Sequence, residues 1–136
     1  MEGSTHEVHT SERKSFRSCR RRWAWIFREN YYPRITAKPL EFGVAYHTAL
    51  EVAYDPDRWG YPANVRRDLA IKAFRLKCEQ QWQHFMSTPE GQMANYEETR
   101  QDYEDRIDLG VGMLRYHFEK IAPDLDKQFE PLAVEV

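Results

Sequence analysis

Three residues in the stretch from 40 to 51, "LEFGVAYHTALE", have types and spacing that could support metal chemistry. Gly43, His47 and Glu51 follow one another at intervals of four residues, which places them on the same side of a helix. An imidazole can bind a divalent metal ion, and a carboxylate one turn away can accept its second N–H and fix the tautomer. Glycine costs about 1 kcal/mol against alanine inside a helix, so Gly43 indicates a place where another backbone or a ligand comes close. The alternative is a histidine at the edge of the core that is hydrogen-bonded to a carboxylate.

A second cluster, near the N-terminus, carries basic side chains. At 100° per residue, one stripe of a helix holds the four cations Lys14, Arg17, Arg21 and Arg28, with Trp25 beside it. This pattern predicts a surface that binds DNA phosphates and an aromatic ring on which a base stacks. The alternative is a solvated basic face that only keeps the helix soluble. The opposite stripe is apolar and consists of Phe16, Cys19, Trp23, Ile26 and Phe27.

The charge distribution favours the nucleic-acid interpretation of that cluster. Residues 11–38 hold nine Lys/Arg and two acidic residues, a local charge of +7, whereas residues 39–136 hold eleven Lys/Arg and eighteen acidic residues, a local charge of -7. A basic segment on an otherwise acidic chain indicates a contact with a polyanion.

The two cysteines, Cys19 and Cys78, are too few for a disulfide framework and show no C-x-x-C spacing. Their number fits a reducing cytoplasm. Cys19 lies on the apolar stripe, where a lone cysteine is usually a small buried hydrophobic residue. The alternative, a ligand of an iron–sulfur cluster, needs three more ligands. No apolar run has the length of a membrane span, and no secretory signal opens the chain, so we expect a soluble cytoplasmic protein.

The elements that must position these residues are mainly helical. Residues 1–10 are expected to be disordered. Apolar residues at helical spacing then predict four helices, with Pro123 ending the last, and the alternation of Leu132, Val134 and Val136 predicts a strand. A strand needs neighbours, and no upstream segment reads as its partner, so we expect the chain to be a fragment. The expected helices cover residues 11–30, 40–54, 65–86 and 96–121.

Taken in order, four segments resemble the N-terminal part of a RecB-type nuclease of the PD-(D/E)XK superfamily, in the phage exonuclease group related to the CRISPR adaptation nucleases. The similarity covers nearly the whole chain from Ser11 onward. The segments are "SERKSFRSCRRRWAW", "LEFGVAYHTALE", "GVGMLRYHFE" and "PLAVEV".

The resemblance implies an α/β nuclease fold, of which residues 11–131 would be the helical N-terminal region and residues 132–136 the first strand of the catalytic core. His47 would be the catalytic residue that binds Mg²⁺ or Mn²⁺, with Gly43 and Glu51 supporting it. Cys19 matches the first cysteine of a [4Fe–4S] cluster, and Glu135 matches a glutamate that precedes the core. DNA would be the substrate, and a recombinase or annealing protein a possible partner.

The same resemblance places the acidic metal ligands and the catalytic lysine downstream of Val136, so the chain alone is expected to be inactive. Three interpretations stay open. The chain is the N-terminal portion of a metal-dependent DNA exonuclease, a non-catalytic helical DNA-binding or inhibitory module derived from one, or a plain helical structural protein.

Overall fold

The computed structural model of the chain describes residues 7–31 and 37–133. Internal contacts divide the chain into two compact units, Met1–Arg34 and Ile35–Val136, which we call unit 1 and unit 2. Each unit is described by itself. None of the helices in the described ranges is both long and apolar enough to cross a membrane.

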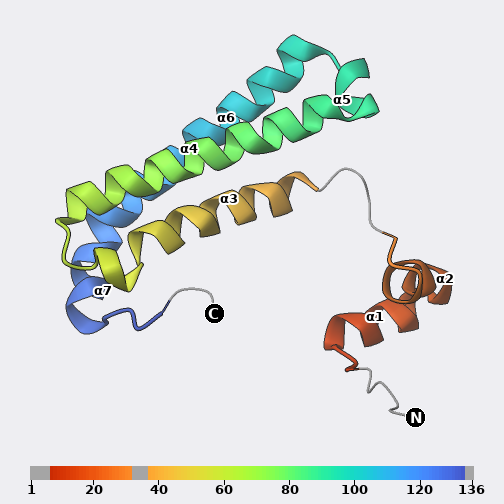
Figure 1. Cartoon of the computed structure of the whole chain (residues 1–136), viewed down its shortest axis with the longest axis horizontal. Coiled ribbons are helices and arrows are strands. Elements are labelled where there is room, and N and C mark those ends of the chain that lie inside the picture. Colours follow the sequence, from red (N-terminus) through yellow and green to blue (C-terminus); the bar gives the residue numbers. More distant parts are fainter. Residues whose placement is uncertain (1–6, 32–36, 134–136) are drawn as a thin grey trace. The chain divides into compact units, whose positions relative to one another are not determined.

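Unit 1 contains two short helical segments rather than the single helix expected over residues 11–30 (Figure 1). The break falls at Cys19, whose backbone is extended, with φ -159° and ψ 107°. The Cys19 N–H donates to the Ser15 carbonyl at 2.9 Å and ends the first segment, while its sulfur accepts from the Arg22 N–H at 3.5 Å and begins the second. Cysteine therefore acts as an N-cap here. The first segment is α1 (Thr10–Ser18), and the second is α2 (Arg20–Trp23), which the π-helical turn η1 (Ala24–Arg28) continues.

A small aromatic contact holds the two segments of unit 1 together. The rings of Phe16 and Trp23 meet edge to face, with centroids 5.1 Å apart. The indole N–H of Trp23 donates to Glu12 Oε1 at 3.2 Å, and Glu12 is only 4% exposed. Phe16 and Glu12 precede Cys19 in the chain, whereas Trp23 follows it. The extended backbone of Cys19 turns the chain so that Trp23 can reach both of them.

Unit 2 is a bundle in which α3, α4 and α6 run alongside one another (Figure 1). Short turns and helices connect and extend them. The elements are α3 (Lys38–Ala53), η2 (Pro56–Arg58), α4 (Ala63–Ser87), α5 (Pro89–Met93), α6 (Tyr96–Tyr116), the π-helical turn η3 (His117–Ile121) and α7 (Ala122–Gln128).

The core of unit 2 combines small residues on α3 with large ones on α4 and α6. Ala45, Ala49 and Ala53 recur every four residues and are fully buried, so α4 can approach α3 closely. Phe74 fills the centre, and a Cβ at Gly110 would overlap its ring. Gly110 is thus required by close packing. The rest of the buried apolar cluster consists of Ala70, Cys78, Val111, Leu114, Phe118 and Ala122.

The expected C-terminal strand, and with it the α/β nuclease fold, is wrong for the part of the chain that the structure describes. No strand occurs in residues 7–31 or 37–133; Leu132 forms a bend and Ala133 has no regular structure, whereas residues 134–136, with Glu135, lie outside the described residues. An alternating pattern forms a strand only beside a partner, and the described residues offer none. The mainly α part of the expectation is confirmed.

The sequence predicted that Pro123 ends the last helix, and this prediction is wrong. Pro123 lies in the first turn of α7, where the missing N–H has no intrahelical partner to lose. The wider turn η3 precedes it and carries the chain from α6 into α7. Ile121, the last residue of this turn, is 45% exposed.

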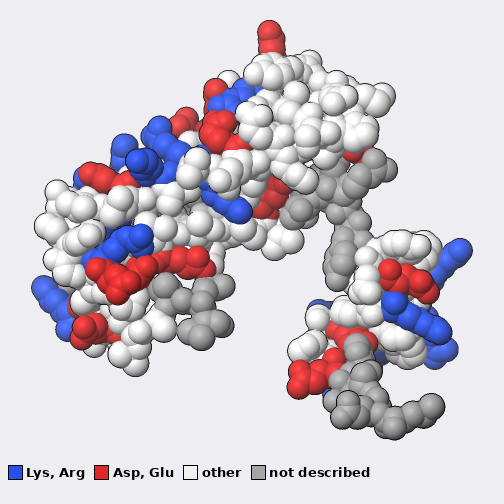
Figure 2. All heavy atoms as spheres, in the orientation of Figure 1, with Lys and Arg blue, Asp and Glu red and all other residues white. Residues whose placement is uncertain are grey.

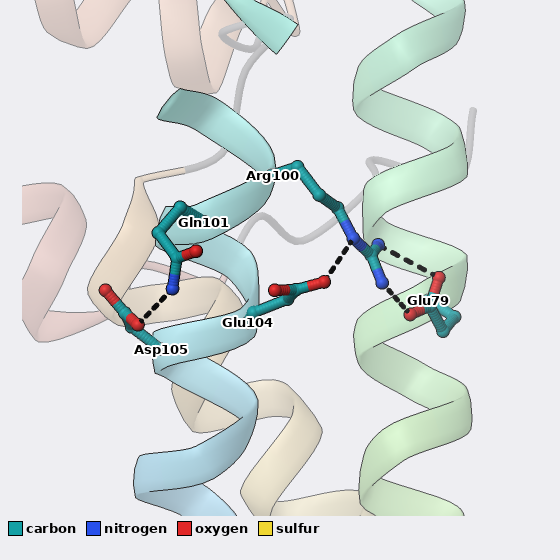
Figure 3. A network of polar contacts seen from close by, with 5 residues as sticks. All are labelled: Glu79, Arg100, Gln101, Glu104 and Asp105. Atoms are coloured by element: carbon teal, nitrogen blue, oxygen red, sulfur yellow. Dashed lines mark hydrogen bonds and ion pairs between the residues drawn. The ribbon is translucent and has the colours of Figure 1, made fainter. Parts of the chain in front are cut away.

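Buried arginines link the helices of unit 2. On α6, Arg106 donates to Glu41 of α3 at 2.8 Å, and both side chains are nearly buried. Figure 3 shows a more exposed contact, in which Arg100 of α6 holds Glu79 of α4 with two hydrogen bonds, at 2.7 and 3.2 Å. The Arg100 guanidinium lowers the pKa of the Glu79 carboxyl below its ordinary value. Every such pair joins residues that are distant in the sequence.

Candidate nucleic-acid interface

Every Lys and Arg side chain that the structure describes in unit 1 is exposed. None of them forms an ion pair with a carboxylate in the part of the chain that the structure describes, and Figure 2 shows blue side chains projecting from this unit. Red side chains lie beside blue ones on both units in this view (Figure 2), so the difference between the units is in the ion pairs that form. The exposed cations of unit 1 are Arg13, Lys14, Arg17, Arg20, Arg21, Arg22 and Arg28.

The break at Cys19 divides the basic stripe that was expected on one continuous helix. Lys14 shares a hollow with Arg22, and Arg17 shares another with Arg13. Arg21 lies over the ring of Trp25, with its guanidinium carbon 5.3 Å from the ring centroid. The cations therefore surround unit 1 in small groups instead of following one line.

Exposed aromatic rings lie among these cations. Trp25 is 49% exposed and Tyr31 is 65% exposed. Phe16, 40% exposed, carries Arg20 over its ring at 5.2 Å. Rings that are held by a guanidinium and open to solvent can accept a further planar group by stacking.

The hollow that contains Lys14 and Arg22 has a mixed lining and a volume of about 350 Å³. Ser11, Ser15 and Ser18 line it together with the two cations, and Ile26 and Phe27 supply apolar surface. The Ser18 hydroxyl donates to the Ser15 carbonyl at 3.1 Å, and the Ser15 hydroxyl is shielded from solvent. The two cations are therefore the groups of this hollow that a negatively charged ligand could meet.

Cys19 is exposed, which corrects the expectation that it packs on the apolar stripe. Its position outside both helical segments explains the difference. No group of three or more His, Cys, Asp or Glu side chains suited to a metal lies within the described ranges. The iron–sulfur cluster therefore stays a prediction of the resemblance.

His47 and Glu51 form the expected pair on α3, with Nε2 and Oε1 3.2 Å apart. The imidazole side chain is 60% exposed and faces away from the bundle core. A Cβ at Gly43 would meet nothing within 4 Å, so no described residue approaches closely there, contrary to the expectation. Two side chains do not supply the ligand set of Mg²⁺ or Mn²⁺, and the metal role of His47 stays a prediction.

A polar cluster that the sequence did not reveal lies where α3, α4, η3 and α7 meet. The Tyr54 hydroxyl lies 2.8 Å from His117 Nε2 and 3.2 Å from Asp126 Oδ1. Arg66, 4% exposed, donates to Asp126 Oδ2 at 2.7 Å and to the Ala53 carbonyl at 3.3 Å. Its guanidinium carbon also lies 4.5 Å from the ring centroid of Trp59. No spacing within one helix could have indicated this cluster, because each member comes from a different element.

The same cluster shifts the pKa values of its members. Burial, with the Asp126 carboxylate second, raises the pKa of Tyr54 to about 12. Burial lowers the pKa of His117 below 6.5, and the Asp126 carboxylate opposes that shift. When the Tyr54 hydroxyl donates to Asp126, its oxygen can accept from a neutral His117 whose proton is on Nε2. These contacts join the end of α3 to α4, η3 and α7.

Compared with protein-family models, with curated proteins and with solved structures, the chain matches none. The assignment of a role therefore depends on the residues themselves.

Proposed function

We propose that the chain is a helical DNA-binding module, in which unit 1 contacts phosphates through its exposed cations. The observation that carries the proposal is that these cations have no carboxylate partner in the described residues, whereas Arg66, Arg100 and Arg106 of unit 2 are all paired. An unpaired guanidinium is free to exchange its counterion for a phosphate. The predicted compartment, the cytoplasm of a bacterial or phage-infected cell, is where such a module would meet DNA.

The proposal makes a quantitative statement about salt. Each phosphate neutralised on duplex DNA contributes about -0.9 to the slope of log K against log[salt]. Contacts by Lys14, Arg17, Arg21 and Arg28 therefore predict a slope of about -3.6. Sequence should have little effect, since phosphate contacts carry no base information.

The test is a titration of the full chain with a labelled 20-base-pair duplex at several salt concentrations. We expect Arg17→Gln to weaken binding to all sequences alike and to make the slope shallower by about 0.9. Arg115→Gln is the matched control, because Arg115 is an exposed arginine on α6 of unit 2. A slope that is the same for the parent, Arg17→Gln and Arg115→Gln would contradict the proposal, as would absence of binding at 20 mM salt.

A further inference from the structure

The aromatic rings of unit 1 have no role in a contact that involves phosphates alone. A duplex offers its phosphates and the edges of its bases, but the faces of its bases are already stacked on one another. A single strand offers phosphates and base faces together. The exposure of Trp25, at 49%, and of Tyr31, at 65%, therefore bears on which form of DNA unit 1 binds.

Two features of unit 1 match the two parts of a nucleotide. The hollow of about 350 Å³ is lined by Lys14 and Arg22, whose two positive charges suit a phosphate. Ile26 and Phe27 in the same hollow suit the apolar side of a sugar or base. Beyond the hollow, Arg21 holds the Trp25 ring from one side at 5.3 Å, so the indole is oriented before a ligand arrives.

We propose that unit 1 binds single-stranded DNA in preference to duplex DNA, with one phosphate between Lys14 and Arg22 and one base stacked on Trp25. The inference rests on the proposed function, since it concerns the same basic surface, but it adds the class of substrate and the residue that selects it. Trp25 discriminates between the two forms, whereas the cations attract both.

The experiment compares a 20-nucleotide single strand of mixed sequence with the matching duplex, using the full chain at the same salt concentration. We expect the single strand to bind at least tenfold more tightly. Loss of one base stack predicts that Trp25→Ala weakens single-strand binding by about 5- to 100-fold and changes duplex binding less than twofold. Trp25→Phe keeps a ring and should restore most of the affinity.

Tyr61→Ala is the matched aromatic control, because Tyr61 is 50% exposed on unit 2. It should change neither affinity. Lys14→Gln together with Arg22→Gln should weaken single-strand binding and make its salt slope shallower by about 0.7, because the pair neutralises one phosphate of the single strand. Helicity of each variant, measured by circular dichroism, confirms that the fold is retained.

Equal affinity for the two forms, or a Trp25→Ala variant that binds the single strand like the parent, would overturn this inference. If the duplex slope still responded to Arg17→Gln, the proposed DNA-binding function would stand without it. Absence of binding to both forms at 20 mM salt would overturn both.

Discussion

The described arginines of unit 1 differ from three arginines of unit 2, Arg66, Arg100 and Arg106, in how they are paired. In unit 2, Arg66 and Arg106 are nearly buried and each donates to a carboxylate, so their charges stabilise the contact between helices. In unit 1, the arginines are exposed, and their guanidinium groups contact aromatic rings or solvent within the described residues. The same side chain thus serves the fold in one unit and remains available to a ligand in the other. Composition alone does not distinguish these uses, but pairing does.

The sharpest test of this contrast applies one substitution to both units. Arg106→Met leaves the Glu41 carboxylate nearly buried without its partner, so we expect unit 2 to lose about 3 kcal/mol of unfolding free energy. Arg17→Met changes an exposed residue and should alter the unfolding free energy by less than about 0.5 kcal/mol. Urea denaturation followed by circular dichroism measures both. If the two variants were equally stable, the buried pair would not hold the bundle together.

The stability of unit 2 should also depend on pH through His117, by a smaller amount than the loss expected for Arg106→Met. Its pKa in the fold lies below 6.5 because the ring is partly buried, so the unfolded chain binds the proton more readily. Stability is therefore fully present above about pH 6.5 and falls as the pH drops below it, by at most about 1.4 kcal/mol per pH unit. The Tyr54 hydroxyl lies 2.8 Å from His117 Nε2, and the Asp126 carboxylate is the charged group that acts on the ring.

Urea midpoints at pH 7.5 and pH 5.5 measure this dependence. In His117→Gln the difference between the two midpoints should shrink, whereas His84→Gln, the matched control on α4, should keep the difference of the parent. If the urea midpoint of the parent chain rose as the pH fell, the pH dependence would be opposite to the one predicted and would contradict the role of His117.

The smallest expected effect concerns the contact between Arg100 and Glu79 that Figure 3 shows. Lysine keeps the charge but cannot make the two parallel hydrogen bonds, so Arg100→Lys should cost about 0.5 kcal/mol. Arg115→Lys, with no bidentate contact among the described residues, should cost nothing measurable. If Arg100→Lys and Arg115→Lys lowered the unfolding free energy by the same amount, the contact between Arg100 and Glu79 would not stabilise the packing of α6 on α4.

The sequence predicted the three long helices of unit 2 to within a few residues but missed α5 and α7. The prediction succeeded where apolar residues such as Phe74, Cys78 and Trp82 recur at helical spacing and are buried. It did not predict the break in unit 1, because the hydrogen bonds of one extended residue, Cys19, decide it. The strand was predicted from the alternation of apolar residues after Pro131 alone, and no second strand was predicted to pair with it.

The candidate site was predicted in part. All of the basic residues chosen from the sequence are exposed, but their arrangement is not the expected stripe. The glycine signal was assigned to the wrong position: Gly43 faces open space, and Gly110 is the glycine that a neighbouring ring requires. A glycine in a helix can mark a position where a neighbouring group leaves no room for a Cβ. The packing of Phe74 against Gly110 identifies that position here.

The alanine ladder of α3 has a consequence for how that helix finds its place. Ala45, Ala49 and Ala53 present nearly the same surface at each turn, so these three alanines alone do not distinguish the observed register of α3 from one shifted by one turn, about 5.4 Å. The directional contacts at its two ends are not periodic: Glu41 meets Arg106 at one end, and the Ala53 carbonyl meets Arg66 at the other. Those two arginines define the register that the alanines leave degenerate.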